Sequence, residues 1–223
     1  YWLGTRSVRA QVIGLATILL GYTAFFFLTA LPPGVSDHWA LNTNAAWRFD
    51  VWFMNLFPRE APFVANEGGY STLSFIPTLG TMILGLLAGG WLQRADKSPL
   101  EKLRGLILSG AVLLGSGWVL GALGWIPIVK RIWTPSWVLF SGGWCCFLLA
   151  AFYGLMELKQ QRAWAKPLLI IGMNSIAAYL IAHLFVGFIS EALPRHLGAN
   201  TFQILGAAYQ PLLHGLGILL VEW

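Results

Sequence analysis

Four polar side chains recur along one apolar stretch of the sequence, and their types could carry acid–base chemistry. Ser175, Tyr179 and His183 follow one another at intervals of four residues, which keeps them within about 40° per step on one side of a helix. Asn174 lies about 100° away from Ser175 around the same helix. The charge of a histidine changes near neutral pH, so His183 could act as a base, an acid or a hydrogen-bonding partner. The pattern predicts either a cavity lined by His183 or hydrogen bonds from these groups to neighbouring helices.

The other residues able to do chemistry predict no metal centre and no Ser-His-Asp set. Cys145 and Cys146 are adjacent and no further cysteine exists, so the spacing that a zinc site requires is missing and both are expected to be small buried apolar groups. His214 is a second histidine within an apolar run, whereas His38 and His196 lie in predicted loops. No glycine-rich loop lies between a strand and a helix to hold a phosphate.

Composition indicates which elements position these residues. Of the 223 residues, 57% are hydrophobic and only 10% are charged, against about 25% charge in a soluble domain. The mean hydropathy is +0.67. Lipid is the solvent that suits this composition, so we predict an all-α, polytopic transmembrane helix bundle. A spanning helix needs about 20 mostly apolar residues, and six stretches qualify: 12–31, 73–92, 106–129, 137–156, 168–188 and 202–221.

The two ends of the sequence lie close to apolar runs, and the first residue, Tyr1, is not a start methionine. We therefore expect residues 1–223 to be a single transmembrane domain that forms the C-terminal part of a longer protein. Within it, Gly85 with Gly89 and Gly117 with Gly121 have the spacing of small residues at which membrane helices approach closely.

The long connection 32–72 carries an aromatic, amphipathic segment. Ala45, Phe49, Trp52 and Leu56 fall on one face of a helix. One interpretation is a short helix that lies in the membrane interface. The other is a helix that dips inward and lines a substrate site, because connections of this length are often functional.

The distribution of basic residues predicts the orientation. Lys and Arg favour cytoplasmic loops, and nine of the 14 lie in one alternate set of connections. This set holds Arg6, Arg9, Arg94, Lys97, Lys102, Arg104, Lys159, Arg162 and Lys166. We predict that these connections are cytoplasmic and that the connection 32–72 is extracytoplasmic. The basic segment 94–104 is explained either by this topology and anionic lipid, or as a landing site for an anionic cytosolic ligand such as a nucleotide-bearing cofactor.

Three segments together resemble one family of membrane enzymes. They are GYSTLSFIPTLGTMILGLLAG at 69–89, KRIWTPSWVLFSGG at 130–143, and GMNSIAAYLIAH at 172–183. In this order they are similar to the heparan-alpha-glucosaminide N-acetyltransferase-like membrane proteins and their bacterial relatives. The resemblance implies a polytopic acyltransferase that takes an acyl group, typically acetyl, from cytosolic acetyl-CoA and delivers it to an amino sugar or glycan across the membrane.

The resemblance also implies roles for particular residues. His183 and Asp50 correspond to the family's helix histidine and outer-loop acid, and are the candidate catalytic residues. Asn174, Ser175, Tyr179, Trp133 and Arg94 are the candidates for binding substrate or coenzyme A. The family's proposed catalytic histidine would lie in an early outer loop, upstream of Tyr1. No metal is implied.

Two other functions are compatible with the residues. Polar groups at membrane depth and proline-interrupted helices also suit a transporter of sugars or small solutes. A membrane scaffold would use the polar stripe only to bind other helices. The expected partners are the lipid bilayer and a glycan acceptor, with no nucleic acid, and a homo-oligomer stays open. The short loops fit a multi-pass protein of a bacterial inner (plasma) membrane.

Overall fold

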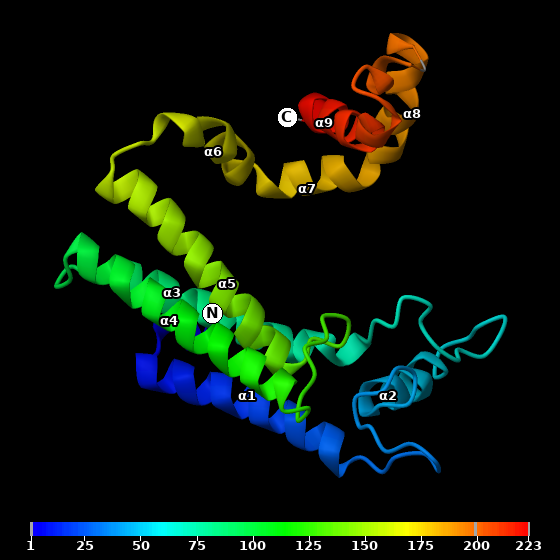
Figure 1. The fold of residues 1–223 in the computed structure, drawn as a ribbon. Helices are drawn as coiled ribbons and strands as arrows, with labels where there is room; N and C mark the ends of the chain where they lie inside the picture. The colour runs from blue at the N-terminus through cyan, green and yellow to red at the C-terminus, as the bar shows by residue number, and fades with distance from the viewer. Residues whose placement is uncertain (1, 199, 223) are drawn as a thin grey trace. The chain divides into compact units, whose positions relative to one another are not determined.

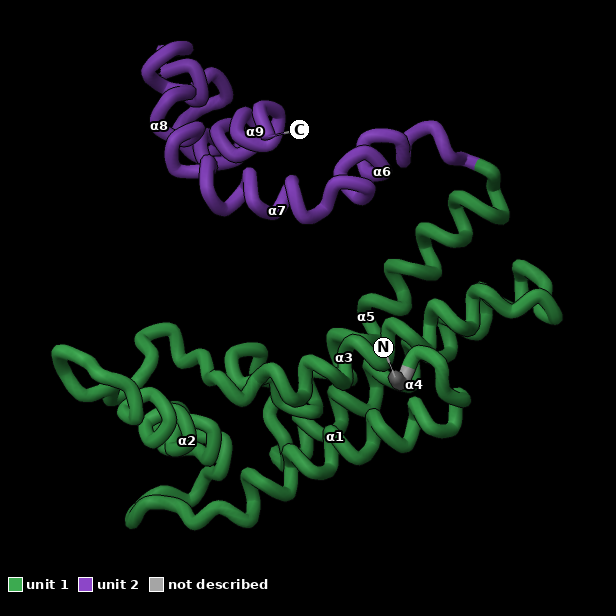
Figure 2. The backbone as a smooth tube through the Cα atoms, turned by 180° about the vertical axis from the view of Figure 1, so that it is seen from behind, with its two compact units in different colours: residues 1–160 green, residues 161–223 purple. Residues whose placement is uncertain are grey.

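The structure is a computed structural model that describes residues 2–198 and 200–222. All regular structure in these two ranges is helical, which confirms the all-α prediction. The chain forms two compact units, one up to Gln160 and the other from Gln161 onward (Figure 2).

Unit 1 is built on four long helices. They are α1 (Val8–Leu28), α3 (Phe75–Leu92), α4 (Pro99–Ala122) and α5 (Pro135–Tyr153), the last extended by a π-helical turn (Gly154–Leu158). Helix α1 packs on α3, α4 packs on α5, and α3 also contacts α5 (Figure 1). The shorter α2 (Ala45–Met54) and the 3-10 turn η2 (Thr72–Ser74) lie in the long connection between α1 and α3. A 3-10 turn, η1 (Trp2–Thr5), precedes α1.

Capping residues decide where the long helices begin. Ser98 and Glu101 form a capping box, and Pro99 occupies the first turn, so α4 begins seven residues before the predicted stretch 106–129. It ends at Ala122, ahead of Gly124, whose φ is +71°. The predicted bounds of this span were therefore wrong, because the hydropathy criterion passed over the charged first turn of the helix.

Glycines allow α4 and α5 to approach closely. A Cβ built on Gly117 would lie 2.5 Å from the backbone N of Phe140, and one on Gly143 would lie 2.5 Å from the backbone N of Leu114. Gly85 and Gly89 on α3 have no neighbouring atom within 4 Å of such a Cβ. The prediction of close packing is thus correct for Gly117 and wrong for the α3 pair, since spacing alone does not tell which face of a helix meets a neighbour.

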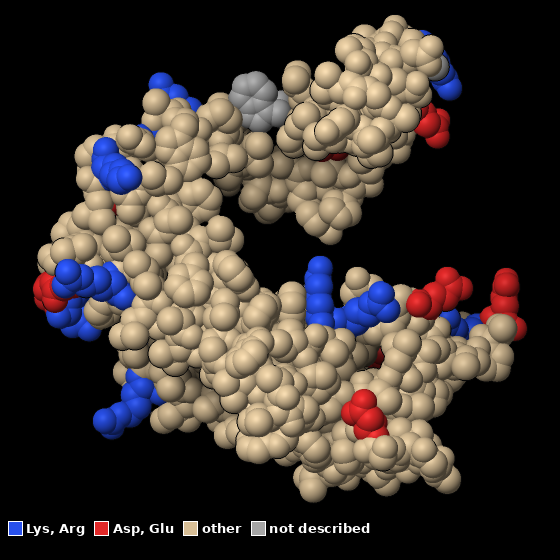
Figure 3. Space-filling view, viewed as in Figure 1, with Lys and Arg blue, Asp and Glu red and all other residues tan. Residues whose placement is uncertain are grey.

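Charged side chains gather at the ends of unit 1, and an uncharged surface covers the long helices between them (Figure 3). The spans Val8–Leu28, Thr72–Leu92, Pro99–Ala122 and Pro135–Leu158 are long and apolar enough to cross a membrane. The chain is a multi-pass membrane protein.

Unit 2 contains shorter helices than the two spans predicted for it. After the turn η4 (Ala163–Ala165) come α6 (Lys166–Met173), α7 (Ser175–Leu184) and α8 (Val186–Leu197). The turns η5 (Thr201–Gln203) and η6 (Ala207–Tyr209) then precede α9 (Gln210–Glu222).

The predicted span 168–188 is broken at Asn174, where ψ is +34° and the helix axis bends by 74°. The predicted span 202–221 gives only the 13-residue α9, because Gly206, with φ +97°, interrupts the run. The described residues therefore hold four spans, or five if the bent pair counts as one, rather than six.

The close approach of α4 and α5 makes a prediction about stability. Replacing Gly117 by Ala should lower the free energy of unfolding by about 1–3 kcal/mol, because the new methyl group must push two backbones apart. Replacing Gly89 by Ala should be neutral or stabilising by up to about 1 kcal/mol, since alanine is the better helix former. Chemical unfolding of both variants in mixed micelles compares them, and equal effects would contradict the packing described.

Candidate functional site

A buried carboxylate, Asp50, lies at the end of unit 1 formed by the α1–α3 connection. The Asn44 side chain caps α2 by accepting a hydrogen bond from the Trp47 backbone N–H at 3.0 Å, and its amide donates to the Ala40 carbonyl at 2.9 Å. The helix therefore begins at Ala45 and turns Asp50 onto the same buried face as Ala46. Only 5% of the Asp50 surface is exposed.

The buried face coincides in part with the predicted apolar face, since Ala45 is buried and Phe49 packs against the core cluster. Helix α2 ends at Met54, so Leu56 lies beyond it, and Trp52 is 60% exposed. Apolar periodicity selected the face that carries Trp52, whereas the capping by Asn44 and the contacts with η2 determine that Asp50 faces inward.

Asp50 accepts hydrogen bonds from a single backbone group. The Thr72 N–H lies 3.2 Å from Oδ1 and 3.0 Å from Oδ2. In the described part of the chain Asp50 forms no ion pair. A carboxylate without a cation is costly to bury, so its presence here favours a functional role.

Polar groups surround a small cavity beside Asp50. Its volume is about 10 Å³, enough for about one water molecule. The side chains that line it with Asp50 include Asn42, Asn44, Asn66, Tyr70 and Ser71. A water held here could carry a proton to or from the carboxylate.

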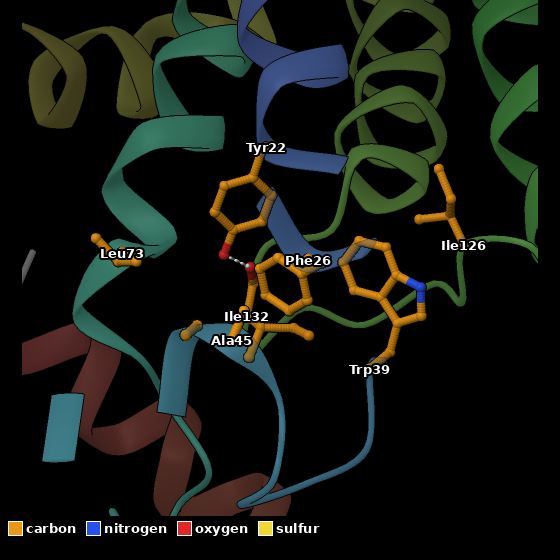
Figure 4. Packing of buried hydrophobic residues seen from close by; sticks show 8 residues of the cluster. Tyr22, Phe26, Trp39, Ala45, Leu73, Ile126 and Ile132 are labelled. Carbon is orange, nitrogen blue, oxygen red and sulfur yellow. Dashed lines mark hydrogen bonds between the residues drawn. The ribbon is translucent and has the colours of Figure 1, made fainter. Parts of the chain in front are cut away.

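An aromatic cluster fixes the loops around this cavity (Figure 4). The buried Tyr22 hydroxyl of α1 donates to the Ile132 carbonyl at 2.9 Å, and Ile132 also lines the cavity. Phe26 stacks on Trp39 with ring centroids 4.4 Å apart. These contacts tie α1 to two connections of unit 1, the segment 32–72 and the segment that joins α4 to α5.

Trp133 follows Ile132 directly and lies in the same region as Asp50. It has a φ of +50°, which is uncommon for a residue with a side chain. Its indole N–H donates to the Thr81 hydroxyl of α3 at 3.1 Å. The sequence-predicted residues Asp50 and Trp133 are thus held at one end of unit 1.

Arg94 lies at the opposite end of α3, in the connection to α4. Its Nε and Nη2 donate to the two carboxylate oxygens of Asp96 at 2.9 and 2.7 Å. The hydrogen bonds from Arg94 lower the pKa of Asp96 to about 2. Arg94 therefore carries a bidentate partner that an incoming anion would have to displace.

The other four predicted site residues lie in unit 2. Ser175, Tyr179 and His183 are all on α7 and are exposed, and the rings of Tyr179 and His183 stack with centroids 3.9 Å apart. The His183 Nδ1 lies 2.9 Å from the Tyr179 carbonyl oxygen. Asn174 occupies the break between α6 and α7, and its amide donates to the Ile170 carbonyl at 3.1 Å. The polar stripe on α7 is as predicted, but Asn174 lies outside that helix.

Sequence reasoning missed Tyr22, Asn44 and Ser71. A weak signal existed for Asn44, since asparagine before an amphipathic segment is a common helix cap. Tyr22 could have been noticed as a polar tip within an apolar span, because a buried tyrosine hydroxyl needs a partner. Ser71 carried no signal of its own.

Comparison with known proteins gives no relative. The chain matches no family model, no curated protein and no solved structure. Support for a function therefore comes from the residues of the chain itself.

The contact between Asp50 and Thr72 makes a prediction about stability. Asp50→Ala should be less stable than Asp50→Asn by about 1–3 kcal/mol, because asparagine keeps an oxygen that accepts the Thr72 N–H and alanine leaves that donor unpaired. Chemical unfolding in mixed micelles measures the difference. The exposed Glu60 supplies the control, since Glu60→Ala and Glu60→Gln should agree within about 0.5 kcal/mol. Equal stabilities of the two Asp50 variants would contradict the contact.

Proposed function

We propose that the chain belongs to an integral membrane acyltransferase that moves an acetyl group from cytosolic acetyl-CoA to an amino sugar or glycan across the inner (plasma) membrane. The observation that supports this most is Asp50, a buried carboxylate without a cation, beside a polar cavity at the end of unit 1 away from the basic α3–α4 connection. The three segments that resemble membrane acetyltransferases point to the same chemistry.

In this proposal Asp50 is the general base for the acceptor. The acceptor amine attacks the thioester carbonyl, so that the C–N bond forms, the C–S bond breaks and coenzyme A leaves as the thiolate, which takes up a proton from water. The amine loses a proton in this process, and Asp50 takes it through one water, because the adjoining cavity of about 10 Å³ is too small for a sugar. Trp133 presents an aromatic surface near the same end, against which a sugar ring could pack.

Asn174 and the polar residues of α7 have side chains of the kind that acyl transfer uses. The Ser175 and Tyr179 hydroxyls and the Asn174 amide are hydrogen-bond donors, which is the group type that stabilises an oxyanion. His183 is a second group able to transfer a proton near neutral pH. These roles follow from the resemblance and from the side-chain chemistry.

Transfer of labelled acetyl groups across a reconstituted membrane tests the proposal. The full-length gene product is placed in liposomes with its basic end outward, labelled acetyl-CoA outside and glucosamine inside. Label should appear on the enclosed glucosamine, and Asp50→Asn and His183→Gln should each reduce the rate by about 10²–10⁴-fold, as expected for the loss of a general base or acid. Glu60→Gln is the matched control. No acetylated glucosamine, and no saturable binding of acetyl-CoA, would refute the proposal.

The pairing of Arg94 with Asp96 makes a separate prediction about coenzyme A. If Arg94 receives a phosphate of acetyl-CoA, Asp96→Asn should lower the KM for acetyl-CoA by up to about fivefold, because the guanidinium no longer has a competing carboxylate. Arg94→Gln should raise this KM, and kcat should change little in both variants. An unchanged KM in both would remove Arg94 from the coenzyme A site.

The break at Asn174 favours a transporter as the second candidate. Discontinuous helices form the substrate sites of many secondary transporters, and α6 and α7 are bent by 74° at this residue. The same liposomes distinguish the two functions. A transporter would equilibrate labelled glucosamine without acetyl-CoA, whereas the acyltransferase would retain it until it is acetylated.

A further inference from the structure

An apolar groove opens between α1, α3 and α4, away from the Asp50 region. Its volume is about 520 Å³. All but three of its lining side chains are hydrocarbon, and the exceptions are Trp91, Ser109 and Cys146. The lining runs from Val8 to Leu15 on α1, from Leu84 to Trp91 on α3 and from Leu106 to Leu113 on α4. Each stretch covers about 10 Å at 1.5 Å per residue, a third of the hydrocarbon core.

Basic residues stand at the end of this groove. The Trp91 indole N–H donates to the Lys102 carbonyl at 3.0 Å, which joins α3 to the first turn of α4 there. Lys102 and Arg104 each lie one helical turn before a lining residue, Leu106 and Leu108, and therefore on the same faces of α4. Arg9 follows the lining residue Val8 in the first turn of α1.

These three cations carry uncompensated charge. The two acids nearest in sequence to Lys102 and Arg104 pair with other cations, since Asp96 pairs with Arg94 at 2.7 Å and Glu101 pairs with Lys97 at 3.1 Å. Arg9, Lys102 and Arg104 form no ion pair with any residue in the part of the chain that the structure describes. Each such cation near a membrane surface attracts anionic lipid.

We propose that this groove is a binding site for one anionic phospholipid, with an acyl chain along α1, α3 and α4 and the phosphate at Arg9, Lys102 and Arg104. The apolar lining matches a hydrocarbon chain. The groove is about 10 Å long, which matches the part of one leaflet nearest the headgroups. The cluster of cations matches a negatively charged headgroup. A phosphatidylcholine has the same acyl chains but no net charge, so it would fill the apolar groove without neutralising the three cations.

Native mass spectrometry of the purified chain tests this with phosphatidylglycerol and phosphatidylcholine of identical acyl chains. One phosphatidylglycerol should be retained over phosphatidylcholine by roughly tenfold. The triple variant Arg9→Gln, Lys102→Gln, Arg104→Gln should bring the two lipids to near parity. The triple variant Arg59→Gln, Lys130→Gln, Arg131→Gln removes the same charge from the other end and should keep the preference. Equal retention of both lipids by the unmodified chain would overturn the proposal.

A second pair of variants tests the acyl-chain part of the site. Ser109→Phe places a ring in the groove and should abolish the retained phosphatidylglycerol, whereas Ser116→Phe, an exposed position on the same helix outside the groove, should not. Ser109→Leu replaces Ser109→Phe if the latter unfolds at a lower temperature than Ser116→Phe. Glycerol phosphate should not compete with the lipid. Retention by the groove-filled variant, or full competition by glycerol phosphate, would show that the groove takes no acyl chain.

Discussion

Hydrocarbon offers no hydrogen bonds, so every polar group that this chain carries toward the membrane must be satisfied within the protein. At the end of unit 1 that holds Asp50 this requirement organises the structure. Tyr22 donates to the Ile132 carbonyl, and the buried Thr134 and Ser136 hydroxyls both donate to the Pro127 carbonyl. Asp50 is the one buried charged side chain among the described residues, and it receives a single backbone N–H. The hydroxyl of Ser71, which lines the cavity beside Asp50, has no hydrogen-bond partner among the described residues, so the network stays open next to the carboxylate to which we assign chemistry.

The helices that position these hydrogen-bonded groups are held by close backbone contacts as well as by side-chain packing. Gly117 and Gly143 let α4 and α5 touch, and this fixes the segment that carries Ile132 and Trp133. The basic α3–α4 connection lies at the other end of the same helices. The acyl transfer that we propose would use this separation, with the basic connection on the side of the thioester and Asp50 on the side of the acceptor.

Much of this architecture could be predicted from the sequence. Composition and run length gave the helical membrane class, and the i, i+4 spacing of Tyr179 and His183 predicted a stripe that the structure confirms. The features that could not be predicted are local ones. The start of α4 depends on the Ser98–Glu101 capping box, the break at Asn174 on one backbone angle, and the inward turn of Asp50 on the Asn44 cap. Apolar runs report burial averaged over a helix, whereas these features depend on single hydrogen bonds and contacts between distant segments.

In the proposed reaction, Asp50 acts on the face of the membrane opposite the basic α3–α4 connection. Cysteine labelling tests it directly, in a protein whose Cys145 and Cys146 are replaced by serine. Glu67→Cys reports the connection 32–72 and Ala95→Cys reports the basic α3–α4 connection, and both positions are exposed. A membrane-impermeant maleimide should label Glu67→Cys in intact cells and Ala95→Cys only after permeabilisation. Labelling of Ala95→Cys alone, or of both positions, in intact cells would contradict the account.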